Sequence, residues 1–187
     1  SAVPANVQLE INEAFESEEL RTIIQAMNPQ LRTEAEIDAA VAAFREQTLF
    51  VFGTDPEYLL GELSGNSAAT TIPAVSLGGG MEFTTVALSQ QVLENPFQLK
   101  ELLMDEFLQM LIYQRFAQMM QEQGMSPEQI WYELRQGNMR AYLELLIKQF
   151  LYQNNIGTVD NYTYHVGDQI FDTALAAFEA LRVDLQG

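Results

Sequence analysis

The segment that most constrains the fold is residues 97–121, which read FQLKELLMDEFLQMLIYQRFAQMMQ. Apolar side chains recur around nearly the whole circumference of a helix built from this segment, so the helix has no broad polar face. A helix of this kind is stable in water only when other parts of the chain cover it on most sides. We therefore predict a long, buried helix over residues 96–123 at the centre of the fold.

Helix starts are marked by N-cap residues, whose side chains accept hydrogen bonds from free backbone N–H groups, and by proline in the first turn. The candidate caps are Ser17, Thr33 with Glu36, Asp55 before Pro56, Asn95 before Pro96, and Ser126 before Pro127 with Gln129. With the apolar periodicity, these caps predict helices over residues 18–27, 34–50, 56–63, 96–123, 127–136, 138–153 and 168–185.

Strand signals are fewer. Residues 70–77 and 81–89 are β-branched or alternating runs on either side of Gly78-Gly79-Gly80, which is typical of two strands joined by a flexible turn. Residues 158–166 are a third candidate strand. The prediction is a predominantly helical α+β fold in a single domain of residues 1–187. In this fold a small sheet or hairpin, which residues 158–166 can extend, packs on the helix that begins at Pro96.

Composition excludes several classes of function. The chain has no cysteine, which removes thiol nucleophiles, disulfides and zinc ribbons. It has 9 Lys+Arg against 26 Asp+Glu and a formal net charge of -17, so nucleic-acid phosphates and anionic membranes should repel it. No apolar run approaches the roughly 20 residues that cross a bilayer. We expect no cofactor, no direct nucleic-acid binding and a protein partner with a basic surface; the oligomeric state stays open.

The acidic, lysine-poor composition also bears on location. An acidic surface keeps secreted and virion proteins in solution, independently of any specific electrostatic role. The chain begins with Ser1 rather than Met, which leads us to expect a processed or trimmed product of a longer protein. An extracytoplasmic or virion-associated protein is therefore favoured.

A polar stripe interrupts the apolar surface of the long predicted helix. Gln98, Glu101, Asp105 and Gln109 recur at spacings of three, four and four residues, with Glu106 beside them, so they share one face. Carboxylates on a core helix must meet solvent, a cavity or a partner. The candidate binding residues are therefore Glu101, Asp105, Glu106 and Gln109. The simpler alternative is that these residues form only the solvated edge of a core helix.

Residues 105–109, in the order Asp-Glu-Phe-Leu-Gln, follow a strand-like run at 82–89 and the helix entry at 99–104. This order resembles the edge strand and active-site helix of zincin-type metallopeptidases, whose helix carries His-Glu-x-x-His. In that family the two histidines bind zinc and the glutamate activates the metal-bound water. Glu106 matches the glutamate, while Asp105 and Gln109 stand at the histidine positions. Because a Gln amide is a poor zinc ligand, the resemblance implies a zincin-like fold without a metal site or catalysis, in a binding or scaffolding role.

Three other functions stay open beside this leading hypothesis of a non-catalytic binding or structural domain. Glu106, with Asp105 or a distant carboxylate such as Asp160, would serve a hydrolase as acid or base. Glu101 with Asp105 and Glu106 would bind Ca²⁺ or Mg²⁺, although the sequence lacks an EF-hand loop. An acidic chain would also inhibit a nucleic-acid-binding protein by imitating phosphates, although the acids are spread over every helix. We interpret His165, the single histidine, as structural, and the methionines as core rather than as a peptide-binding groove.

Overall fold

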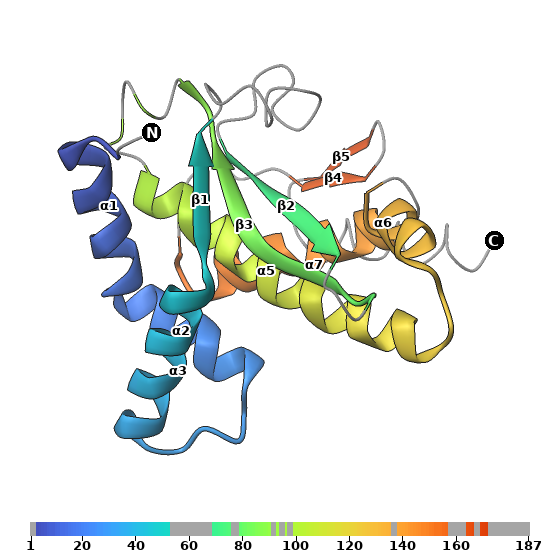
Figure 1. Cartoon of the computed structure of the whole chain (residues 1–187), viewed down its shortest axis with the longest axis horizontal. Helices are drawn as coiled ribbons and strands as arrows, with labels where there is room; N and C mark the ends of the chain where they lie inside the picture. The colour runs from blue at the N-terminus through green and yellow to red at the C-terminus, as the bar shows by residue number, and fades with distance from the viewer. Residues whose placement is uncertain are drawn as a thin grey trace. The chain divides into compact units, whose positions relative to one another are not determined.

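The computed structural model describes residues 3–52, 69–75, 79–90, 93, 96, 99–135, 138–156, 164–166 and 169–171. Its elements in chain order are α1 (Ala5–Phe15), α2 (Glu18–Met27), α3 (Glu34–Gln47), β1 (Leu49–Phe52), β2 (Ala69–Val75), β3 (Met81–Leu88), α5 (Leu99–Glu122), α6 (Pro127–Arg135), α7 (Asn138–Gln153), β4 (Tyr164–Val166) and β5 (Gln169–Phe171) (Figure 1). The chain divides into two compact units, which we call unit 1 (residues 1–74 and 82–111) and unit 2 (residues 75–81 and 112–187). The described residues confirm a predominantly helical α+β fold.

Capping side chains fix where α2 and α3 begin in unit 1. The backbone N–H of Leu20 donates to the Ser17 hydroxyl at 3.1 Å. Thr33 and Glu36 form the full capping box, in which the Glu36 N–H donates to Thr33 Oγ1 at 3.1 Å and the Thr33 N–H donates to Glu36 Oε1 at 3.2 Å. Both predicted starts are confirmed. The predicted elements did not include α1, because its N-cap, Pro4, makes no side-chain capping hydrogen bond.

The sheet of unit 1 has the strand order β1-β3-β2. β1 pairs in parallel with β3, so that Leu49 lies opposite Thr85 and Phe52 lies opposite Leu88. Figure 1 draws β2 on the other side of β3 and running in the opposite direction. The strands predicted over residues 70–77 and 81–89 are confirmed as β2 and β3, and β2 lies at an edge of the described sheet.

The prediction of one continuous helix over residues 34–50 is wrong at its end. α3 stops at Gln47, and Thr48 already has an extended backbone while its hydroxyl donates to the Phe44 carbonyl at 2.6 Å. The next four residues, Leu-Phe-Val-Phe, form β1, and three of them are aromatic or β-branched residues that are enriched in strands. An apolar run of this length fits a buried helix and a strand equally well, and here pairing with β3 decides the outcome.

Four phenylalanines from four different elements meet in the core of unit 1. Phe15 of α1, Phe44 of α3, Phe50 of β1 and Phe107 of α5 have ring centroids 5.0 to 6.1 Å apart in four pairs. Phe107 is fully buried, and the buried side chains of α5 point to most sides of the helix. The prediction that α5 is a buried central helix is therefore confirmed for its first half, within unit 1.

Unit 2 contains the second half of α5, followed by α6 and α7. α5 ends shortly before Gly124, whose φ of +87° is a left-handed conformation that favours glycine. α6 begins with the predicted capping box, in which the Gln129 N–H donates to Ser126 Oγ at 3.2 Å and the Ser126 N–H donates to Gln129 Oε1 at 2.9 Å. Both α6 and α7 match their predicted ranges; α6 is marked by its capping box and α7 by apolar periodicity.

The third predicted strand needs correction. Residues 164–166 form β4, but β4 pairs antiparallel with β5 in a separate two-stranded sheet, with His165 opposite Ile170, instead of extending the sheet of β2 and β3. β5 also lies where the helix over residues 168–185 was predicted to begin. Two residues, Gly167 and Asp168, separate the strands, a spacing that favours a hairpin over a helix start. The remainder of that predicted helix and the helix predicted over residues 56–63 lie outside the described residues.

Candidate functional site

The four candidate binding residues all lie on the first half of α5, in unit 1. Glu101 is exposed, Asp105 and Glu106 are half-buried, and Gln109 is buried with 8% of its surface exposed. The stripe therefore runs from solvent at Glu101 to the protein interior at Gln109. The alternative that the stripe is only the solvated edge of a core helix therefore fits Glu101 but does not fit Gln109. Gln98, which also belonged to the predicted stripe, lies outside the described residues.

Glu106 is tied to the sheet of unit 1 by a hydrogen bond. The Thr71 hydroxyl of β2 donates to Glu106 Oε2 at 2.7 Å, and Thr71 has 1% of its surface exposed. A hydrogen bond from a neutral donor to a carboxylate is stronger than one between neutral groups. This contact links an edge strand of the described sheet to α5. Sequence reasoning missed Thr71 because it lies 35 residues away from Glu106 and no local pattern indicates that β2 packs there.

The depth of Gln109 matters for its chemistry. An amide side chain offers two N–H donors and one carbonyl acceptor and carries no charge. Burying such a group costs far less free energy than burying a carboxylate, because no ion has to leave water. Position 109 is therefore occupied by a polar group that the interior tolerates without a bound cation, whereas Asp105, its neighbour one turn earlier, keeps partial access to solvent.

Acidic side chains gather near the exposed end of the stripe. Burial raises the pKa of Glu10 on α1, and the negative charges of Glu13 and Glu101 raise it further, while Lys100 acts in the opposite direction. Lys100 Nζ also lies 3.4 Å from Glu19 Oε1 of α2. Within the described ranges, no group of three or more His, Asp or Glu side chains is arranged to hold a metal ion. The Ca²⁺ or Mg²⁺ hypothesis therefore gains no support from this part of the chain.

The other candidate residues fall elsewhere. Asp160, the distant carboxylate considered as a second acid, lies outside the described residues. His165 lies in β4 of unit 2, and its backbone position is all that the structure describes. Neither Asp160 nor the His165 side chain therefore belongs to the described surroundings of Glu106.

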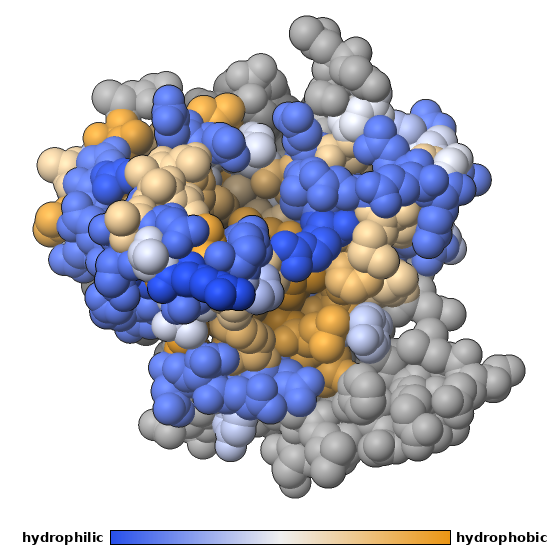
Figure 2. Space-filling view, turned by 90° about the horizontal axis from the view of Figure 1, so that it is seen from below, coloured by the Kyte–Doolittle hydropathy of each residue, from blue (hydrophilic) through white to orange (hydrophobic). Residues whose placement is uncertain are grey.

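Figure 2 shows hydrophilic residues over much of the described surface on this face, around a hydrophobic area near its centre. Among the described residues, the exposed large hydrophobic side chains come from five different elements, and they are Leu9, Leu49, Met119, Tyr132 and Tyr152. Single exposed hydrophobic residues are common on protein surfaces and do not by themselves mark a docking site. None of the described helices is long and apolar enough to cross a membrane.

No protein-family model, curated protein or solved structure matches this chain. The zincin-like resemblance thus depends on the residues and element order of this chain alone.

Proposed function

We propose that this chain is a non-catalytic binding or structural domain built on a degenerate zincin-like scaffold. One observation carries the proposal, namely that the Glu106 carboxylate accepts a hydrogen bond from the buried Thr71 hydroxyl. In a metallopeptidase the corresponding carboxylate must reach a metal-bound water, and two imidazoles must flank it on the helix. Here the Asp105 carboxylate and the buried Gln109 amide stand at those two positions. We interpret the hydrogen bond of Glu106 to β2 as a structural contact in place of a reaction centre.

The arrangement of β2 and α5 supports the scaffold part of the proposal. β2 is an edge strand of the described sheet, and its Thr71 contacts the helix at the position that the resemblance assigns to the catalytic glutamate. The resemblance was inferred with residues 82–89 as the edge strand, but these residues form β3, which lies in the middle of the described sheet. The edge strand that contacts the helix is β2 instead. The likeness concerns the packing of one strand against one helix, and the function is argued from the side chains themselves.

The charge distribution favours a protein partner with a basic surface. The first three helices of unit 1 expose many carboxylates, which are Glu13, Glu16, Glu18, Glu34, Glu36, Asp38 and Glu46. A surface of this kind attracts cationic partners at long range and repels phosphate backbones. Glu101 is the exposed member of the stripe and is the residue through which a bound partner would contact α5.

A hydrolysis assay separates this proposal from the enzyme alternative. The wild-type chain and a Glu106→Gln variant are incubated with an unfolded protein substrate, with and without added zinc. We expect the same background rate from both proteins under both conditions. A wild-type rate above background, with or without zinc, that disappears in Glu106→Gln would establish the hydrolase and exclude the proposal.

A binding assay tests the role of the stripe. A lysine-rich peptide is titrated into the wild-type chain, a Glu101→Gln variant and a Glu82→Gln variant. Glu82 is an equally exposed acid on β3, so its variant controls for the loss of one charge. We expect Glu101→Gln to weaken binding more than Glu82→Gln does, and salt to weaken binding in all three proteins. Equal effects of the two substitutions would mean that only net charge attracts the peptide, and would contradict a site on α5.

A further inference from the structure

α3 buries few of its side chains. Of its 14 residues only Ile37 is buried, whereas the shorter helices α1 and α2 each bury several apolar side chains. Most of the stability of a protein helix comes from packing its apolar face, and elements with few buried contacts open most easily. The contacts that hold α3 in place are therefore concentrated at a few side chains.

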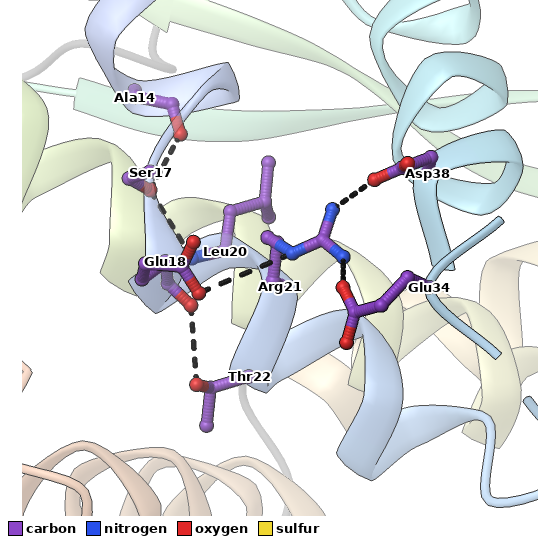
Figure 3. A network of polar contacts seen from close by, with 8 residues as sticks. All are labelled: Ala14, Ser17, Glu18, Leu20, Arg21, Thr22, Glu34 and Asp38. Atoms are coloured by element: carbon purple, nitrogen blue, oxygen red, sulfur yellow. Dashed lines mark hydrogen bonds and ion pairs between the residues drawn. The ribbon is translucent and has the colours of Figure 1, made fainter. Parts of the chain in front are cut away.

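The N-terminal half of α3 is held mainly by Arg21 of α2. Figure 3 shows the Arg21 guanidinium pointing at the Glu34 and Asp38 carboxylates of α3, with which it forms ion pairs, while Glu18 of its own helix lies 4.0 Å away. The side chains of Glu34 and Asp38 are 84% and 65% exposed. Solvent ions reach such carboxylates freely, so this attachment is sensitive to salt.

The C-terminal half of α3 is held differently. The Phe44 ring lies 6.1 Å from the Phe15 ring and 5.1 Å from the Phe107 ring, measured between centroids. The Arg45 guanidinium lies 5.2 Å from the centre of the Phe15 ring and donates to Asn12 Oδ1 at 2.6 Å. Packing between apolar rings depends only weakly on ionic strength compared with exposed ion pairs. Arg45 also forms an exposed ion pair with Glu16 at 3.8 Å, but the ring contacts of Phe44 do not depend on it. The C-terminal half of α3 should therefore respond less to salt than the N-terminal half.

We propose that residues 34–40 of α3 form a latch that Arg21 holds closed and that opens locally when salt screens its ion pairs. Opening releases the Thr33–Glu36 capping box and uncovers Ile37, which has 4% of its surface exposed in the closed form. The rest of α3 stays anchored by Phe44. The ionic strength of the surroundings thereby controls whether an apolar side chain of α3 is available for contact.

Amide hydrogen exchange on the full chain, at about 0.05 M and about 1 M NaCl, tests the latch. In the wild type we expect exchange of the amides of residues 37–42 to accelerate roughly two- to fivefold at high salt, and that of residues 43–48 to accelerate clearly less. In an Arg21→Ala variant, exchange of residues 37–42 should already be fast at low salt and should no longer respond to salt.

Arg32→Ala is the matched control, because it removes the same charge from an exposed residue of the connection between α2 and α3 and should behave as the wild type. A Glu34→Gln and Asp38→Asn double variant removes the same ion pairs by neutralising the two carboxylates. It replaces Arg21→Ala in the test if Arg21→Ala does not fold. Salt-independent exchange of residues 37–42 in the wild type would overturn the latch. So would equal acceleration of both halves of α3, or a wild-type salt response in Arg21→Ala.

Discussion

Replacing Thr71 with valine removes the hydroxyl that donates to Glu106 and keeps the shape of the side chain. A hydrogen bond to a charged group contributes about 1.5–3 kcal/mol, and the half-buried carboxylate would lose it. Part of this loss is offset because a buried valine has no polar group to desolvate. We therefore expect Thr71→Val to lower the free energy of unfolding by about 1–2 kcal/mol, measured by urea unfolding followed by circular dichroism.

A double-mutant cycle shows whether this loss comes from the contact itself. Glu106→Gln keeps an acceptor but removes its charge, so the two substitutions combined should cost less than their sum, with a coupling energy of about 1 kcal/mol. Thr22→Val is the control, since the exposed Thr22 hydroxyl donates to the Glu18 carbonyl at 3.1 Å and its loss should change stability by at most about 0.5 kcal/mol. The reasoning is refuted if Thr71→Val costs no more than Thr22→Val.

Three further predictions concern stability. Phe107→Ala empties a fully buried position in the aromatic core and should cost about 3–5 kcal/mol in urea unfolding; a loss under about 1 kcal/mol would contradict a central α5. Glu10 has a folded-state pKa raised above its ordinary 4.5, so the wild type should lose stability as pH rises from about 4.5 through that pKa. Glu10→Gln should remove this component of the pH dependence, and an unchanged pH profile of the unfolding free energy would argue against it. Gly124→Ala should cost about 1–2 kcal/mol from its positive φ alone, since an added Cβ meets no atom within 4 Å, and a neutral effect on the thermal midpoint would disprove this.

The starts of α2, α3 and α6 were predicted correctly because they are encoded by short-range chemistry. Thr33 and Ser126 each form a capping box with a residue three positions later, and such pairs are visible in the sequence. α1 has no such signal at Pro4. Leu49 begins a strand because β3 lies beside it, and a pairing partner that is distant in the sequence cannot be inferred from an apolar run of four residues.

In the candidate site, too, the sequence predicts what depends on local spacing and does not predict what depends on tertiary packing. The spacing of Asp105, Glu106 and Gln109 was enough to place them on one buried helix, and their positions on α5 confirm that part. Their different depths and the partner of Glu106 depend on how β2 packs, which is a tertiary property. Thr71, which donates a hydrogen bond to Glu106, carries no sequence signal of its own.

Restoring both imidazoles tests the central claim most directly, namely that α5 is a zincin-like helix without its metal ligands. A variant combining Asp105→His with Gln109→His places two histidines one turn apart, with Glu106 between them. A control combining Gln118→His with Glu122→His places an equally spaced pair on the exposed surface of the same helix. Native mass spectrometry and competition with a chelator should find one zinc ion per chain in the first variant, held at least about tenfold more tightly than in the control. Binding no tighter than in the control would contradict the zincin-like interpretation.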